Sequence, residues 1–240
     1  MQNIKIPILM YHSIESMPKS TVMRSLHVPP RRFDFQMKML KLLGYQALSL
    51  KKLKPYLDGK KQGKVVGITF DDGYQNNLIN AVPILLKYNF SATCYIVSEN
   101  LGLSNTWDLD KGITQRPLMT IDEIKSWLSF GMDIGGHTQT HADLTKISIK
   151  AAKREINTSK GDLENTFNTQ VTDFCYPFGR FNDLISDLVK ESGYLSATTM
   201  ERGIVKSMTN RFMLPRMPIN HRTLPHLFLA KILTNYEDRR

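Results

Sequence analysis

Seven short apolar runs, each about the length of a β-strand, alternate along this sequence with longer stretches whose apolar residues recur at helical spacing. This alternation is typical of βαβ units, and apolar runs without polar interruption indicate strands covered on both faces of a parallel sheet. The sequence therefore predicts an α/β fold. The expected strands are residues 6–10, 65–70, 92–97, 132–135, 171–176, 194–198 and 212–219.

The intervening segments carry helix signals. Phe33, Met37 and Leu40 repeat at helical spacing, and Thr120 followed by Glu123 forms a capping-box pattern. Periodicity does not decide whether seven strands close into a small barrel or remain an open sheet. Both arrangements build their sites at the carboxyl ends of the strands, so functional residues are expected directly after the strands.

Length, charge and cysteine content set broad limits. With 240 residues, the chain is expected to form a single domain over residues 1–240. Its 32 basic and 22 acidic residues give a net charge of +10, which favours an anionic partner. Cys94 and Cys175 lie in apolar runs and are expected to be buried thiols. Because no signal-peptide core or run of 18 apolar residues is found, we expect a cytoplasmic location, with the inner membrane face as an alternative.

Two adjacent carboxylates follow the second expected strand. Asp71 and Asp72 come directly after residues 65–70, and Gly73 allows a sharp turn. Neighbouring side chains on an extended backbone point in different directions, so one acid could bind a metal ion while the other accepts a proton. A solvent-exposed Asp-Asp-Gly turn is the simpler interpretation of this motif taken alone.

Two histidines follow another strand. His137 and His141 are four residues apart, a spacing that could place both imidazoles on one face of a helical turn. Two imidazoles and one carboxylate form a three-ligand set that leaves a position open for water, and Asp72 is the natural third ligand.

Three further segments end or follow strands. Pro177 and Gly179 form a tight loop whose amides could face a developing oxyanion. His12 ends the first strand, and Arg216 lies in the last one. Taken singly, His12 and Arg216 would be interpreted as structural residues.

Taken together, these motifs resemble the polysaccharide deacetylases, the carbohydrate esterase family 4 that contains the NodB homology domain. The resemblance runs through the segments LMYHSI, TFDDGY, PILLKYNFSATCYIV, GGHTQTH, CYPFGRFN and LPRMPI in that order. It implies a distorted (β/α)7 barrel of the TIM type and a metal-dependent hydrolase that removes N-acetyl groups from amino sugars.

The resemblance also implies roles for individual residues. Asp72, His137 and His141 would bind a divalent metal, most often Zn²⁺ in this family, and Asp71 would be the general base. The segment Tyr176, Pro177 and Phe178 would border the acetyl pocket and lend a backbone amide to the oxyanion. His12 would be the general acid.

The third motif departs from the family pattern. Phe178 replaces the usual tyrosine, and the arginine that usually precedes this loop is missing. Arg216 is therefore expected to partner Asp71 from the last strand, as in related members. The late Leu-x-His motif is also not recognisable, so His221 or His226 could stand in for His12.

Several functional alternatives stay open at this point. An O-acetyl esterase or a related metal-dependent amidase would use the same residues, and a catalytically idle sugar-binding module would keep the fold but not need Asp71. Expected substrates are an acetylated amino-sugar glycan or a lipid-linked sugar. Nucleic-acid binding is not expected, because aromatic residues are not interleaved with the basic ones. Peripheral membrane contact is suggested by a lysine cluster, namely Lys51, Lys52, Lys54, Lys60, Lys61 and Lys64.

Overall fold

In the computed structural model the described residues are 5–239, so residues 1–4 and 240 of the expected single domain lie outside the description. The strands are β1 (Lys5–Ile6), β2 (Ile8–Tyr11), β3 (Gln46–Leu48), β4 (Val65–Phe70), β5 (Thr93–Ile96), β6 (Asp133–Gly136), β7 (Asp173–Cys175), β8 (Ser196–Arg202), β9 (Val205–Lys206) and β10 (Leu214–Pro218). The α-helices are α1 (Pro30–Leu42), α2 (Leu50–Leu57), α3 (Val82–Lys87), α4 (Ile121–Ser129), α5 (Ile149–Phe167), α6 (Asp183–Glu191) and α7 (Pro225–Leu233).

Seven parallel strands close into a barrel. The hydrogen-bonded order is β2-β10-β8-β7-β6-β5-β4, and β4 pairs back to β2 to complete the ring. β3 pairs with residues 65–67 of β4, and β5 pairs with Thr69 and Phe70 further along. The (β/α)7 barrel implied by the family resemblance is confirmed.

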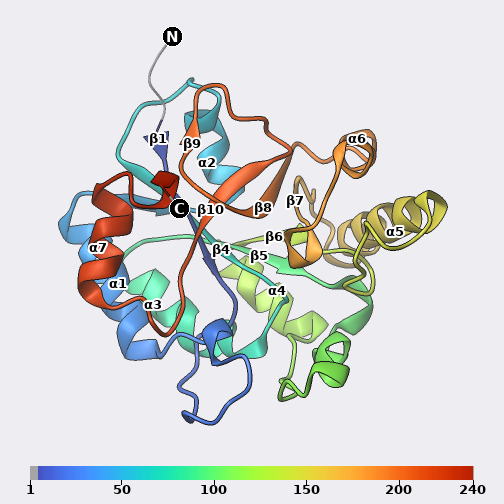
Figure 1. The fold of residues 1–240 in the computed structure, drawn as a ribbon, viewed down its shortest axis with the longest axis horizontal. Helices are drawn as coiled ribbons and strands as arrows, with labels where there is room; N and C mark the ends of the chain where they lie inside the picture. Colours follow the sequence, from blue (N-terminus) through green and yellow to red (C-terminus); the bar gives the residue numbers. More distant parts are fainter. Residues whose placement is uncertain (1–4, 240) are drawn as a thin grey trace.

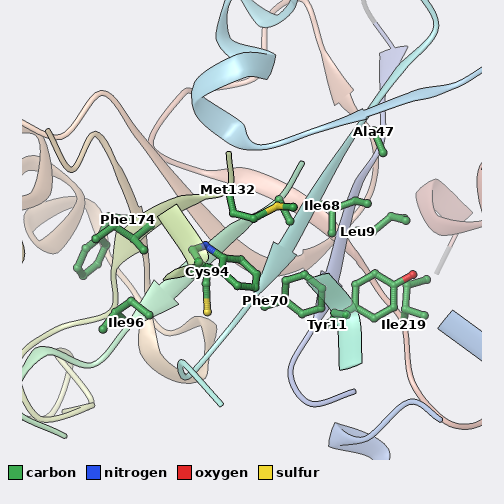
Figure 2. Packing of buried hydrophobic residues seen from close by; sticks show 14 of the residues in the cluster. Leu9, Tyr11, Ala47, Ile68, Phe70, Cys94, Ile96, Met132, Phe174 and Ile219 are labelled. Carbon is green, nitrogen blue, oxygen red and sulfur yellow. The ribbon is translucent and has the colours of Figure 1, made fainter. Parts of the chain in front are cut away.

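Side chains along β4 alternate between two environments, as they must in any strand. Val66, Ile68 and Phe70 belong to the main hydrophobic cluster, which joins the strands to the surrounding helices, with Phe33 of α1 and Trp127 of α4 packed against Phe70. Figure 2 shows Ile68 and Phe70 beside Leu9 and Tyr11 of β2. The alternate residues face the barrel interior, and this alternation carries Asp71 inward as well.

α2 covers the amino-terminal end of the barrel. Leu50, Leu53 and Leu57 pack in a second cluster with strand residues such as Ile8 and Leu214. A side chain at Gly67 would lie 3.0 Å from Cδ2 of Leu53, so the helix approaches the strand as closely as a glycine permits. In Figure 1, α2 lies near β1 and β9 at the top of the view, and the blue segment between β2 and α1 lies at the bottom. The carboxyl ends of the strands therefore lie at the end of the barrel opposite α2.

The seven expected strands are found with shifted ends. The first is shortened because Pro7 separates β1 from β2, and β1 pairs instead with β9 in antiparallel fashion. The capping box at Thr120 is formed as predicted: its side chain accepts from the Glu123 amide, and the Glu123 carboxylate accepts from the Thr120 amide. β3 and α2 were not predicted.

Candidate active site

The predicted site residues meet at the carboxyl ends of the strands. Asp71 and Asp72 follow β4, His137 follows β6, the Tyr176 segment follows β7 and His12 follows β2. They surround one cavity of about 310 Å³, which is lined by His12, Asp71, Asp72, His137, His141, Tyr176 and Phe178 among others.

Asp72, His137 and His141 converge at the base of this cavity. The Oδ1 atom of Asp72 lies 3.4 Å from Nε2 of His137 and 3.4 Å from Nε2 of His141. All three residues are buried, and their candidate ligand atoms lie within 4.8 Å of one another. These distances are too long for good hydrogen bonds.

This geometry fits a metal ion. Two ligand atoms that each lie about 2.1 Å from a tetrahedral Zn²⁺ are about 3.4 Å apart, close to the separations of Asp72 from the two histidines. His137 is also oriented for such a role, because its Nδ1 lies 2.8 Å from the carbonyl oxygen of Cys175. An N–H at Nδ1 leaves the lone pair on Nε2, the nitrogen that faces Asp72.

His141 is held between two aromatic rings. Trp107 stacks on its imidazole with centroids 4.5 Å apart, and Phe178 meets it edge-on at 4.7 Å. Its Nδ1 atom is buried and has no hydrogen-bond partner among the described residues. Ring packing therefore orients His141, whereas a hydrogen bond orients His137.

The two histidines do not lie on one helical turn, contrary to the expectation from their four-residue spacing. Residues 137–141 form an irregular loop in which Thr138 and His141 adopt left-handed backbone conformations, with φ of 65° and 62°. Asp72 (φ 76°) and Phe178 (φ 58°) are left-handed as well. Such conformations are unfavourable for residues other than glycine, and their concentration around one cavity is typical of functional sites.

Asp71 forms a buried ion pair with Arg216. The guanidinium donates to both carboxylate oxygens, at 2.7 Å from Nη1 and 2.8 Å from Nη2. Its remaining N–H groups donate to the Thr69 hydroxyl, the Thr199 carbonyl and the Cys175 sulfur. All five donors of Arg216 are thus satisfied in the barrel interior, and the sequence-based pairing of Asp71 with Arg216 is present.

These contacts determine the ionisation of both aspartates. Burial alone would raise the pKa of Asp71, but the positive charge of Arg216 outweighs burial and lowers that pKa below its ordinary value. Burial would likewise raise the pKa of Asp72, but the polar interactions with the nearby imidazoles of His137 and His141 hold it well below the ordinary value. Both carboxylates are therefore ionised at neutral pH.

His12 lies on the other side of Asp71. Its Nε2 is 3.8 Å from Oδ2 of Asp71, and its side chain is 17% exposed at the cavity wall. His221 lies in the loop after β10 and His226 in α7, and neither lines this cavity. Of the three candidate acids, the structure brings His12 to the site.

The loop after β7 forms the wall next to His141. Tyr176 is buried, and its hydroxyl donates to the Phe212 carbonyl at 3.0 Å. Pro177 is also buried, and Phe178 follows in a 3-10 turn. The Phe178 amide donates to none of the described residues. A side chain at Gly179 would come within 2.5 Å of Cβ of Met200, so this tight turn requires glycine.

Other cavity residues were not predicted. Trp107, Asp108, Lys111 and Ile113 come from the long segment between β5 and α4, and Val22, Met23 and Leu26 come from the segment between β2 and α1. Neither segment carries a periodic pattern. The one local signal in the sequence was the presence of apolar residues between His12 and α1. Surface loops are mostly polar, so apolar residues in such a loop indicate a contact or a binding site.

The lysine cluster lies at the opposite end of the barrel. Its residues belong to α2 and to the segment that leads into β4, next to the starts of the strands. Lys52 donates to the Gly131 carbonyl at 2.7 Å, and Lys54 lies 3.6 Å from Asp58. These lysines therefore cannot contact a ligand that is bound in the cavity.

Comparison with known proteins identifies the family. A family model described as polysaccharide deacetylase matches residues 58–197, more than half of the chain. The chain belongs to the polysaccharide deacetylase family. The resemblance noted in the motifs is thereby confirmed.

Individual members of the polysaccharide deacetylase family show the same similarity. YxkH of Bacillus subtilis, a protein assigned to the polysaccharide deacetylases, is 33% identical over 90% of this chain and 72% of its own length. The poly-β-1,6-N-acetyl-D-glucosamine N-deacetylase of Staphylococcus aureus is 28% identical over 87% of this chain and 73% of its own. The deacetylase PplD of Streptococcus pyogenes, solved in complex with acetate, superimposes with a TM-score of 0.83 at 29% identity, over 96% of this chain and 99% of PplD.

Within residues 5–239, none of the helices combines the length and the apolar character needed to cross a membrane.

Proposed function

We propose that this polysaccharide deacetylase family member is a metal-dependent hydrolase that removes N-acetyl groups from amino sugars. One observation carries the proposal: a carboxylate kept ionised by a buried arginine lies beside a two-histidine, one-carboxylate cluster in a single cavity. A sugar-binding module would have no use for the buried Asp71–Arg216 pair, whereas a hydrolase needs a base at this position.

Asp72, His137 and His141 would hold the divalent ion, and Zn²⁺ suits this combination of two nitrogens and one oxygen. When bound, such an ion polarises the acetyl carbonyl and lowers the pKa of water.

Asp71 would accept the proton of the attacking water. Arg216 supports this role in two ways, because its bidentate contact fixes the carboxylate orientation and its charge keeps the carboxylate ionised. His12, on the exposed side of Asp71, would donate a proton to the departing amine. The Phe178 amide, which donates to no other described residue, would donate to the oxyanion.

The substrate class follows from the relatives. The Staphylococcus aureus relative is named for poly-β-1,6-N-acetyl-D-glucosamine, so an N-acetylated amino sugar is the proposed substrate. An O-acetyl esterase or a related amidase would require the same ion, base and oxyanion donor. Acetate release from matched N-acetyl and O-acetyl sugars separates these activities. The cytoplasmic location expected from the sequence stays a prediction.

The test combines metal analysis with acetate release. Wild-type protein should contain about one equivalent of zinc and release acetate from an N-acetylated amino-sugar oligomer. Asp71→Asn should retain the metal and lose nearly all activity, whereas Asp72→Ala and His137→Ala should lose both. Turnover by Asp71→Asn close to the wild-type rate would remove Asp71 from the role of base.

A second comparison identifies the acid. His12→Ala should lower turnover and leave the metal content unchanged, and His221→Ala and His226→Ala should change turnover little. The reverse result would transfer the role of acid to the residue whose loss lowers turnover.

A further inference from the structure

The mouth of the cavity is apolar. Val22, Met23 and Met200 line it while being 48%, 49% and 45% exposed, and Leu26 and Ile113 continue the apolar lining inward. Single exposed apolar side chains are ordinary on protein surfaces. Here three of them border the same cavity that holds the proposed catalytic residues.

The aliphatic part of this lining, Val22, Met23 and Met200, offers no side-chain hydrogen-bond partner to a free polysaccharide. Sugar hydroxyl groups that are placed against aliphatic side chains lose their hydrogen bonds to water and gain none in return. Beyond the catalytic residues, the polar side chains of the lining are Asp108 and Lys111, which are paired with each other at 2.9 Å. The mouth therefore favours a ligand that carries an apolar group.

Positive charge adjoins this apolar mouth. Arg24 lies on the short helical turn between Met23 and Leu26, and the Nη1 group of Arg32 donates to the His221 carbonyl in the loop after β10. β10 is the barrel neighbour of β2, so these segments lie at one side of the cavity.

The pKa of His221, in the loop after β10, is also affected by nearby arginines. Its pKa is lowered first by burial and then by the charges of Arg24, Arg222 and Arg32. The groups that act most on the pKa of His221 include no carboxylate, and Arg24 and Arg222 form no ion pair with a carboxylate of residues 5–239.

We infer that the natural substrate is an amino sugar joined through a phosphate to an apolar carrier. The sugar would enter the cavity, the phosphate would lie against Arg24 and Arg222, and the carrier would lie against Val22 and Met23 at the mouth. This inference rests on the proposed function and specifies its substrate. The lysine cluster plays no part, because it lies at the opposite end of the barrel.

The first experiment compares three N-acetylated substrates with metal-loaded enzyme. They are N-acetylglucosaminyl farnesyl diphosphate, N-acetylglucosamine 1-phosphate and a β-1,6-linked N-acetylglucosamine pentamer. The farnesyl compound should have a kcat/KM at least tenfold above that of either other substrate. A pentamer that is deacetylated as efficiently as the farnesyl compound would overturn the inference and leave the proposed function intact.

Variants separate the carrier contact from the phosphate contact. Val22→Asn and Met23→Gln should lower kcat/KM at least fivefold for the farnesyl compound alone. Arg24→Gln and Arg222→Gln should lower it for both phosphorylated substrates and leave the pentamer unchanged. Matched controls are Leu42→Gln, which removes a 69% exposed apolar side chain elsewhere on the surface, and Lys61→Gln in the lysine cluster; both should behave as wild type. Equal effects of the mouth variants and the controls would contradict the inference.

A binding measurement keeps the inference independent of catalysis. A fluorescent analogue of the farnesyl compound should bind Asp71→Asn at least tenfold more tightly than an analogue without the carrier, and Val22→Asn in that background should abolish the difference. If none of the three substrates is hydrolysed but this difference is present, the proposed function fails and the inferred ligand stands. If the two analogues bind equally, the inference fails whatever the activity.

Discussion

Cys175 contacts both halves of the active site. Its carbonyl oxygen lies 2.8 Å from Nδ1 of His137, one of the proposed metal ligands, and its sulfur accepts the fifth N–H of Arg216, the partner of Asp71, at 3.2 Å. The residue is fully buried. Its side chain therefore positions Asp71 indirectly, through the guanidinium.

Removal of this sulfur should weaken catalysis without emptying the metal site. Cys175→Ala leaves one buried N–H of Arg216 without an acceptor, which costs about 1–3 kcal/mol, and we expect kcat to fall about tenfold with KM nearly unchanged. Cys175→Ser keeps an acceptor and should restore most of the activity. Steady-state kinetics with zinc analysis tests this, and equal kcat values for the two variants would show that the acceptor is irrelevant.

At the scale of elements, α2 is expected to contribute to the stability of the fold and not to catalysis, because it packs at the starts of the strands. Leu53 is fully buried between α2 and the starts of the strands, far from the carboxyl ends. Leu53→Ala should lower the free energy of unfolding by about 2–5 kcal/mol because it leaves a cavity in this cluster. Metal content and kcat of the folded protein should stay at wild-type values.

Urea denaturation and activity at low temperature measure the two effects of Leu53→Ala. Lys51→Ala, on the exposed face of the same helix, is the matched control and should change the free energy of unfolding by less than about 0.5 kcal/mol. A loss of metal from folded Leu53→Ala would mean that the two ends of the barrel are coupled.

The pairing of β7 with β8 contains a titratable group away from the active site. Asp173 lies opposite Ser196, whose hydroxyl donates to it at 2.6 Å. Burial raises the pKa of Asp173 above its ordinary value, despite hydrogen bonds from Ser196 and Thr172. The folded state therefore binds this proton more tightly than the unfolded state, and the stabilisation is lost as the pH rises from about 4 through the folded pKa.

Asp173→Asn removes this pH dependence. The Tm of the variant minus the Tm of the wild type should become more positive between pH 4 and pH 7, as measured by thermal unfolding at several pH values. Asp122→Asn, which makes the same substitution at a 92% exposed carboxyl away from the β7–β8 pairing, is the control. A pH-independent difference for Asp173→Asn would show that this carboxyl titrates alike in both states.

The elements differ in how far the sequence could predict them. The strands were located within a few residues because each is a nearly continuous apolar run between helical segments. β3 has three residues, too few for a periodic signal. Leu50, Leu53 and Leu57 have helical spacing, but nothing local indicates that α2 covers the end of a barrel.

At the scale of the whole molecule, closure of the barrel depends on contacts between distant segments. β2 pairs with both β4 and β10, so β2 closes the ring of strands. The pattern of residues within each strand carries no information about these partners. The closed barrel was therefore predicted from the family resemblance and not from the pattern. The meeting of Asp72, His137 and His141 beside Asp71 could be predicted from motifs at strand ends. The contributions of Trp107 and Met23 to the cavity could not, because they lie in long loops whose path depends on the tertiary structure.

The proposed metal binding by Asp72, His137 and His141 would be linked to the stability of the entire barrel, since the three residues follow β4 and β6, which the ring holds together through β5. An ion that binds only the folded state adds about 2.7 kcal/mol at a hundredfold excess over Kd. In a domain of this size that corresponds to a rise in Tm of about 5–10 °C. Wild-type protein in zinc should therefore unfold in one transition at a Tm higher by this amount than in chelator.

Asp71→Asn and Asp72→Ala provide the comparison for this shift. Asp71→Asn keeps the three ligands, so its Tm should still rise on addition of zinc even though loss of the ion pair with Arg216 lowers its starting value. Asp72→Ala should show no zinc-dependent rise, because two imidazoles alone bind the ion much more weakly. Differential scanning calorimetry measures both quantities. Two separate transitions would contradict a single domain over residues 1–240, and equal zinc shifts in the two variants would place the ion elsewhere than at Asp72.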